Sequence, residues 1–148
     1  MAVCASGSDH SLFIDPLGCV WGCGSNRMGQ LGMVSSLPIL SPQKLNILPP
    51  IISVSAGARF SLFLDENGSV WSCGQGHLNG FGIRILPEIT TNLPKIFSAV
   101  ALSQSSLFLD FEGSVWACGC NESGQLGLGD IRDRHKPERV VGLPKIYR

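Results

Sequence analysis

Charged side chains are scarce in this sequence and make up 15% of its 148 residues. That share lies below the value of about a quarter that is typical of globular domains, so we expect much of the chain to be buried. The 11 basic side chains balance 11 acidic ones, which leaves a formal net charge of zero. A general polyanion binder needs a clustered basic excess, so nucleic acid is not an expected partner.

Long apolar runs are missing as well. No run approaches the roughly 18 residues that a membrane-spanning helix requires, so we expect no membrane partner. The first residues, from Met1 to Asp9, contain neither the basic nor the apolar region of a secretion signal. We therefore expect a soluble intracellular protein, cytoplasmic or nuclear. Eighteen glycines against one tyrosine indicate many tight turns rather than long helices.

The sequence also lacks the usual metal and disulfide spacings. It has six cysteines but no Cys-x-x-Cys pair, and only three histidines could assist as ligands. Cys23, Cys73 and Cys118 each follow a tryptophan by two residues, which favours small residues in buried strands. We expect no metal and no cofactor.

Catalytic motifs are absent too. There is no Gly-x-Ser-x-Gly sequence. The pair His10-Ser11 has no acidic partner, and we interpret its imidazole as bonding a neighbouring backbone group. Gly22-Cys-Gly24 and Gly74-Gln-Gly76 follow strands with no helix behind them, so neither can form a phosphate cradle. We expect that the protein is not an enzyme.

What the sequence does contain is one repeat of roughly fifty residues, present three times. Trp21, Trp71 and Trp116 lie 50 and 45 residues apart. Each sits in a Gly-x-Val-Trp-x-Cys-Gly segment, at Gly18–Gly24, Gly68–Gly74 and Gly113–Gly119. Ser-Leu-Phe, an aliphatic residue and Asp come before it, at Ser11–Asp15, Ser61–Asp65 and Ser106–Asp110. Gly-Gln-Leu-Gly or a weaker version follows, at Gly29–Gly32, Asn79–Gly82 and Gly124–Gly127, and Leu-Pro-x-Ile ends each unit, at Leu48–Ile51, Leu93–Ile96 and Leu143–Ile146.

Each repeat predicts a hairpin built on an Asp-x-x-Gly turn, because Asp bonds backbone amides at the first turn position and Gly is favoured at the fourth. The flanking runs, such as Phe60–Leu64 and Ser69–Cys73, have the length and composition of strands. A further strand precedes each hairpin, and a fourth follows the glycine loop. These outer strands are expected at Ile51–Ala56 and Phe97–Ala101 before the hairpins, and at Lys44–Leu48 and Glu138–Val141 after the loops.

The hairpins are apolar on both faces. Leu62 and Leu64 point one way and Phe63 the other, so each sheet must be covered on both sides. Small sheets stacked around an axis satisfy this requirement. We therefore predict an all-β fold, a partial β-propeller made of three four-stranded antiparallel blades with the tryptophans packed between them. The chain is expected to form a single domain over 1–148, with repeats at approximately 2–50, 51–95 and 96–148.

This pattern resembles the regulator of chromosome condensation repeat. His10-Ser11 in the first repeat and Gly124–Asp130 in the third match it closely, and the resemblance spans residues 2–148. It departs from the family pattern where the usual His is replaced by Phe60 and Ser105, and where the usual Gly before it is Leu102. The resemblance implies a seven-bladed ring, of which three repeats are present. We expect a section of a longer protein or, if the chain exists alone, self-association through two open apolar blade faces.

In the expected four-stranded meander, successive connections alternate between the two ends of each blade. The first connections, near 7–10, 58–60 and 103–105, share one end with the long third connections at 24–42, 74–87 and 119–136. That end varies most in length and charge, so we expect it to contact a partner. The candidate contact residues are Asp9, His10, Arg59, Gln104, Arg132 and Arg134. The structural anchors of the repeat are Trp21, Trp71, Trp116, Gly18, Gly68, Gly113, Gly32 and Gly127.

The leading functional hypothesis is a non-enzymatic protein–protein interaction module within a larger regulatory protein. Every recurring residue has a structural interpretation, while the variable residues lie in loops. The resemblance implies an alternative, guanine-nucleotide exchange on a small GTPase, because that is the activity of the founding family member. A further alternative is the substrate-binding part of a ubiquitin ligase, as in HECT-type members with these repeats. Chromatin binding is disfavoured by the neutral charge balance.

Overall fold

The computed structural model describes residues 2–76 and 82–147 and arranges them as three four-stranded antiparallel sheets. The strands are β1 (Cys4–Ser6), β2 (His10–Ile14), β3 (Val20–Gly24), β4 (Ile39–Lys44), β5 (Ile51–Ala56), β6 (Phe60–Asp65), β7 (Val70–Gln75), β8 (Ile83–Ile89), β9 (Ile96–Ala101), β10 (Ser105–Asp110), β11 (Val115–Gly119) and β12 (Arg134–Arg139). Within these ranges there is no helix. The predicted all-β fold of three antiparallel blades is confirmed.

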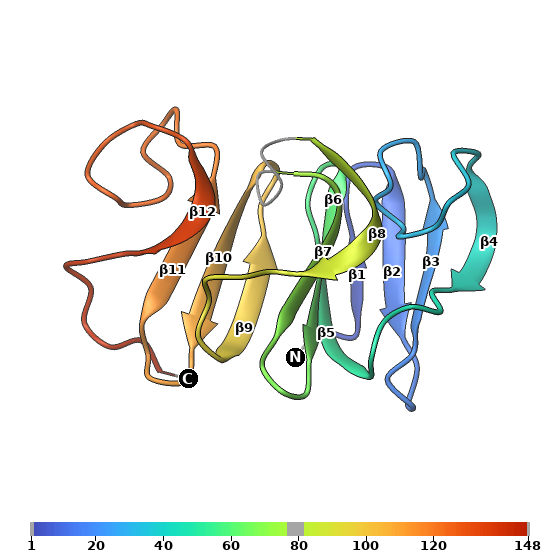
Figure 1. Cartoon of the computed structure of the whole chain (residues 1–148), viewed down its shortest axis with the longest axis horizontal. Coiled ribbons are helices and arrows are strands. Elements are labelled where there is room, and N and C mark those ends of the chain that lie inside the picture. Colours follow the sequence, from blue (N-terminus) through green and yellow to red (C-terminus); the bar gives the residue numbers. More distant parts are fainter. Residues whose placement is uncertain (1, 77–81, 148) are drawn as a thin grey trace.

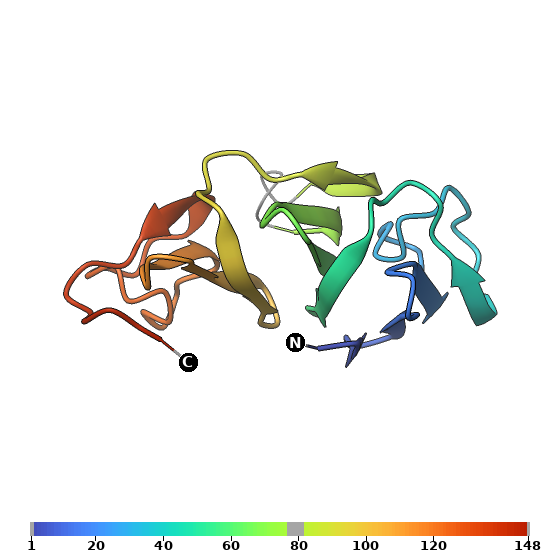
Figure 2. The same cartoon turned by 90° about the horizontal axis from the view of Figure 1, so that it is seen from below.

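The three sheets stand side by side (Figure 1) and follow an arc (Figure 2). Each sheet is a simple meander, in the orders β1-β2-β3-β4, β5-β6-β7-β8 and β9-β10-β11-β12. The first strands β1, β5 and β9 line the concave side of the arc, and β4, β8 and β12 lie toward its outside (Figure 2). The first and third connections of each blade meet at one end, and the Asp-x-x-Gly turns lie at the other (Figure 1).

One carboxylate organises each Asp-x-x-Gly turn. Oδ1 of Asp65 accepts hydrogen bonds from the backbone amides of Asn67 at 2.9 Å and Ser69 at 3.0 Å, and Oδ2 accepts one from the indole Nε1 of Trp71 at 3.0 Å. Asp15 and Asp110 make the same three contacts in their own blades, at 2.8–3.0 Å. The sequence predicted the turn, but not that its aspartate also orients the tryptophan.

In the first and third blades, the hydrogen bonds to Asp15 and Asp110 favour the ionised carboxylate. The bond from the Trp21 indole contributes most to lowering the pKa of Asp15. At Asp110, burial raises the pKa, but the bonds from Trp116 and from the amides of Ser114 and Glu112 together outweigh it and lower the pKa. The stability that these carboxylates contribute is therefore present above the ordinary aspartate pKa of about 3.9 and is lost as the pH falls below it.

The middle blade is buried on both faces, and every residue of β6 is buried. Phe63 packs with Leu12 and Leu31 of the first blade. Leu62 and Leu64 face the other way and pack with Phe108 of the third blade. Trp71 packs against the first of these cores and Trp116 against the second. The hairpin is apolar on both faces because one face packs against the first blade and the other against the third.

The junction between the first two blades also has a polar centre. The hydroxyl of Ser61 donates to the carbonyl of Gln30 at 2.5 Å, and Nε2 of His10 lies 2.9 Å from the same Ser61 oxygen. Because the serine proton is already directed to Gln30, Nε2 of His10 is the donor in the second contact. The thiol of Cys73 reaches the Gln30 carbonyl as well, at 3.5 Å. Besides the backbone contact that was expected, which the Phe60 backbone provides, His10 thus bonds a side chain of the next blade that the sequence analysis did not predict.

The Leu-Pro-x-Ile segments set the spacing of the blades. The amide of Ile51 donates to the carbonyl of Gly18, that of Ile96 to Gly68 and that of Ile146 to Gly113, each at 2.9 Å. Gly18, Gly68 and Gly113 have φ values of 81–83°. Only glycine adopts this left-handed conformation readily, which explains its recurrence at the turn. The last segment of each repeat is thus hydrogen-bonded to the Asp-x-x-Gly turn of the same repeat.

The fourth strands differ from the prediction. They cover Ile39–Lys44 and Arg134–Arg139 rather than Lys44–Leu48 and Glu138–Val141. Each fourth strand contains a proline, at Pro42, Pro87 or Pro137. The pairing with the third strand shifts register at this place in all three blades, and the other edge of the strand has no partner strand in the sheet. Proline is tolerated at such bulged edge positions, whereas the sequence-based prediction began each strand after it.

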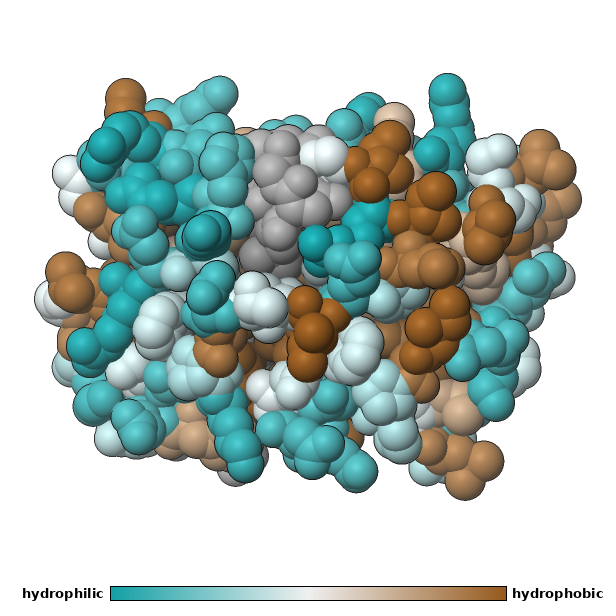
Figure 3. All heavy atoms as spheres, viewed as in Figure 1, coloured by the Kyte–Doolittle hydropathy of each residue, from teal (hydrophilic) through white to brown (hydrophobic). Residues whose placement is uncertain are grey.

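The three fourth strands differ in composition. Apart from Pro137, β12 consists of charged residues and His135, whereas Ile83, Ile85, Leu86 and Ile89 of β8 are exposed by 40–54%. Apolar side chains gather over the region of β8 in Figure 3.

We predict that Asp65→Ala lowers the free energy of unfolding by about 2–4 kcal/mol, because it removes three hydrogen bonds to a buried carboxylate. Urea denaturation followed by tryptophan fluorescence measures this loss. Glu66→Ala is the control, because Glu66 is the exposed neighbour in the same turn, and it should change stability by less than about 0.5 kcal/mol. Equal effects of the two substitutions would contradict the role of Asp65.

We also predict a pH-dependent contribution from His10. Burial lowers the pKa of its imidazole, and the backbone of Phe60 and the charge of Asp9 oppose this shift without cancelling it. The folded pKa then lies below the unfolded value of about 6.5, so stability present above that pH is lost as the pH falls through the folded pKa. His10→Phe, which copies Phe60 of the second repeat, should flatten the pH dependence of the urea midpoint between about pH 7.5 and 5. An unchanged slope would contradict this prediction.

Candidate partner-binding face

The first connection of each blade is a tight turn with the same hydrogen bond. The amide of Gly7 donates to the carbonyl of His10 at 2.9 Å, that of Gly57 to Phe60 at 2.9 Å, and that of Leu102 to Ser105 at 2.8 Å. The residue before the acceptor is Asp9, Arg59 or Gln104. These three residues are therefore structural counterparts, one from each blade.

The third strand of each blade ends against this turn. The carbonyl of Asp9 accepts from the amide of Ser25 at 2.7 Å, that of Arg59 from Gln75 at 2.9 Å, and that of Gln104 from Cys120 at 3.0 Å. The preceding Gly24, Gly74 and Gly119 have φ values of 99–118°. A Cβ at any of them would collide with the carbonyl of Asp9, Arg59 or Gln104 respectively. The backbone of each counterpart is thus fixed, while its side chain is exposed.

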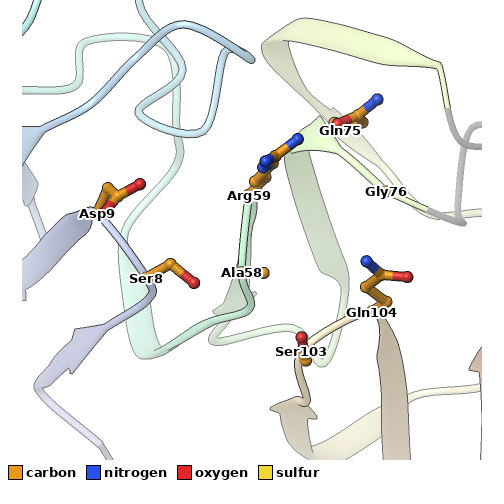
Figure 4. Close-up of a pocket in the computed structure, with 8 residues that line it drawn as sticks. All are labelled: Ser8, Asp9, Ala58, Arg59, Gln75, Gly76, Ser103 and Gln104. Atoms are coloured by element: carbon orange, nitrogen blue, oxygen red, sulfur yellow. The ribbon is translucent and has the colours of Figure 1, made fainter.

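These turns surround a groove of about 520 Å³. It is lined by Ser8, Asp9, Ala58, Arg59, Gln75, Gly76, Ser103 and Gln104. Figure 4 shows Asp9, Arg59 and Gln104 arranged along it, on turns from three different blades. One carboxylate, one guanidinium, two amides and two hydroxyls offer both donors and acceptors, and together they carry no net charge.

The predicted contact residues divide into three groups. Asp9, Arg59 and Gln104 lie together in the groove. Arg132 is exposed, at 81% of its side chain, but lies in the third connection of the third blade. His10 and Arg134 lie elsewhere, and the expectation of a contact role does not fit their surroundings.

His10 is only 3% exposed, inside the junction with Ser61. Arg134 belongs to β12 rather than to a loop, and its side chain is 13% exposed. It pairs with Asp130 at 2.9 Å and with Glu138 at 3.0 Å. The part of the second repeat's glycine loop at 77–81 lies outside the described residues, so the predicted 79–82 motif is not placed.

Asp130 secures the third connection of the third blade. Its carboxylate accepts hydrogen bonds from the Arg134 guanidinium, from the backbone amide of Arg132 and from the Arg132 side chain. The contact with Arg134 contributes most to holding the pKa of Asp130 well below its usual range, and the same pair raises the pKa of Arg134. The charge cluster at 130–139 is therefore mainly internal to its loop and strand.

Two buried asparagines organise the glycine loops, and the sequence-based reasoning missed them. Oδ1 of Asn26 accepts from the Leu31 amide at 2.9 Å, and its Nδ2 donates to the carbonyls of Met33 and Ser35. Asn121 does the same with the Leu126 amide and with the carbonyls of Asp130 and Arg132. Both follow the Cys-Gly anchor by two residues, which was the available signal. Gly76 occupies this position in the second repeat.

Metal ligands, buried thiols and membrane-spanning helices were sought among the described residues. Within residues 2–76 and 82–147, no three His, Cys, Asp or Glu side chains come together as a metal site requires. Burial raises the pKa of the Cys73 thiol, and it raises that of Cys118 to about 12, so both thiols stay protonated and unreactive at neutral pH. Over the same ranges, no helix is long and apolar enough to cross a membrane.

Solved structures with this architecture exist. Prp20p of Saccharomyces cerevisiae superimposes with a TM-score of 0.81 at 24% sequence identity, over 93% of this chain and 37% of that one. The same yeast protein in its complex with Kap60 gives a TM-score of 0.81 at 26% identity, over 93% and 36%. Human WBSCR16 gives 0.82 at 25% identity, over 92% and 36%. The chain thus spans little more than a third of the length of these relatives.

Two sequence models of the regulator of chromosome condensation repeat match the chain. One matches residues 18–64 and 112–147, and the other matches 3–30 and 51–82. No curated protein sequence matches it significantly. The first model alone covers more than half of the chain, and the fold agrees with it blade by blade. The chain therefore belongs to the regulator of chromosome condensation (RCC1) repeat family.

Proposed function

We propose that the chain is a non-enzymatic protein-interaction module whose contact site is the groove formed by the first connections of the three blades. The observation that supports this most directly is the equivalence of Asp9, Arg59 and Gln104. Hydrogen bonds hold the three backbones in one conformation, yet the three exposed side chains differ in charge and shape. A rigid scaffold that presents variable side chains is a common design for recognition.

The groove suits a polar protein segment. Its donors and acceptors can bond a peptide backbone or polar side chains, and its balanced charge does not favour a polyanion. Arg59 lies at the centre of the groove, between turns of the first and third blades (Figure 4). Arginine is among the residues that most often dominate the binding energy of protein interfaces.

The relatives add support from their own partners. The Prp20p structure is described together with its binding properties to Gsp1p and histones, and the second structure is a complex with Kap60. All of these partners are proteins. A protein partner met in the cytoplasm or nucleus is accordingly our proposal for this chain.

Guanine-nucleotide exchange is the second candidate, and the match with the Gsp1p-binding Prp20p favours it over the ubiquitin-ligase alternative. The described groove would supply contacts from three blades only. Release of a fluorescent guanine nucleotide from a panel of small GTPases tests the idea. Release accelerated by the chain, and not by its Arg59→Ala variant, would replace simple binding with exchange as the function.

We predict that Arg59→Ala combined with Gln104→Ala weakens capture of the partner by about tenfold or more, as expected when a central interface residue is removed. Cross-linking in cell extract followed by quantitative mass spectrometry identifies the captured proteins, and binding of each purified candidate is then titrated. Glu66→Ala is the matched control, because Glu66 is exposed at the opposite end of the strand that follows Arg59. A partner that binds the double variant as tightly as the wild type would place the contact elsewhere.

A further inference from the structure

The three turns that form the groove contact one another directly. The amide of Ala58 donates to the carbonyl of Ser103 at 2.9 Å, which ties the turn of the second blade to that of the third. Gly7 lies so close to the carbonyl of Gly57 that a Cβ at Gly7 would collide with it, so the turn of the first blade packs on that of the second. The backbone therefore fixes the spacing of the three counterpart side chains as well as their individual conformations.

These side chains follow a fixed order of charge along the groove. Asp9 of the first blade is negative, Arg59 of the second is positive and Gln104 of the third is neutral. All three are exposed, and Figure 4 shows Arg59 between the other two. A ligand that crosses the groove from the first blade to the third thus meets a carboxylate, a guanidinium and an amide in turn.

The two charges are not used within the described part of the chain. The salt bridges among residues 2–76 and 82–147 lie in β8 and at residues 130–138, and none includes Asp9 or Arg59. Although these two side chains belong to adjacent turns, they do not neutralise each other. Both charges are therefore available to a ligand. A guanidinium matches a carboxylate through two parallel hydrogen bonds, which makes a carboxylate the best partner for Arg59.

We propose that the groove binds an extended protein segment in which an acidic side chain pairs with Arg59 and a basic side chain, on the side of the first blade, pairs with Asp9. A neutral polar side chain of the segment lies against Gln104. This inference rests on the proposed function, because it specifies the partner of the same groove. Complementary charges at fixed positions contribute more to specificity and to the rate of association than to affinity.

The same order of charge discriminates against other ligands. A segment that is acidic throughout brings a negative charge to Asp9, and a segment that is basic throughout brings a positive charge to Arg59. Like charges opposed across an interface suppress the binding of wrong partners. A polyanion such as nucleic acid is disfavoured for the same reason. The groove therefore selects a segment with both signs of charge in one order.

Selection from a random peptide display library on the purified chain tests this charge order. Peptides enriched on the wild type should combine an acidic and a basic residue at a constant spacing. Arg59→Glu should replace the acidic preference by a basic one, and Asp9→Lys should replace the basic preference by an acidic one. Arg139→Glu and Glu66→Lys are the matched controls, because they make the same charge changes at exposed positions near the Asp-x-x-Gly turns. Both controls should retain the wild-type preferences.

A charge exchange between the chain and one enriched peptide tests the pairing at Arg59. Fluorescence anisotropy measures binding of the labelled peptide. Arg59→Glu should weaken this binding by about tenfold or more, and lysine in place of the peptide's acidic residue should restore the affinity of that variant to within about threefold of the wild-type pair. Binding of the original pair should weaken as the salt concentration rises, because ions screen exposed charges.

The results that would overturn this inference are distinct from those that would overturn the proposed function. Peptides that lose binding in the Arg59→Ala, Gln104→Ala double variant but show no preference for charge would refute the charge order and support the groove as a contact site. Charge preferences that persist in Arg59→Glu and Asp9→Lys would place the contact outside the groove and contradict both proposals, as would a wild type that enriches no peptide. Circular dichroism and thermal melting establish that each variant is folded. Arg59→Gln and Asp9→Asn replace a variant that is not folded, and each should abolish the corresponding preference.

Discussion

A single carboxylate, repeated three times, connects the local and the long-range structure. Asp15, Asp65 and Asp110 each bind two turn amides and one indole, so the same group closes the hairpin and orients the tryptophan. In the second and third blades this ring packs at the junction with the preceding blade. The carbonyl of the turn glycine then accepts a hydrogen bond from the amide of the isoleucine in Leu-Pro-x-Ile. In the first two repeats this isoleucine is the first residue of the next blade. Turn, blade and blade spacing therefore depend on one aspartate side chain per repeat.

The two blade junctions are built differently around this common frame. In the first, His10, Ser61 and Gln30 form a buried polar chain surrounded by apolar side chains. In the second, Phe60 replaces the histidine and packs with Phe108. The second repeat also has Gly76 where the others have a loop-organising asparagine. The repeat tolerates such exchanges because the contacts of the turn carboxylate with two amides and one indole remain in every blade.

Sequence reasoning succeeded where the determinants are local. The Asp-x-x-Gly turns, the hairpins and the two-sided burial of Phe63 and Leu62 follow from spacing and alternation, and the meander placed Asp9, Arg59 and Gln104 at one end. It failed where the partner is distant or the backbone is irregular. The contact of His10 lies 51 residues away in Ser61. Arg134 is mostly buried because it lies in strand β12 and not in the preceding loop. The prediction started this strand after Pro137, whereas the strand begins earlier and contains the proline.

The prolines of β4, β8 and β12 affect how the sheets can contact other molecules. Each lies on a strand at the rim of its sheet, where an unprotected row of amides would invite another chain to add a strand. Proline removes one donor from that row and accompanies the local shift in pairing. Lateral growth of the sheets, the route toward fibrous aggregates, is thereby discouraged. The loops can therefore bind partners, while the edge strands are protected from pairing with strands of other molecules.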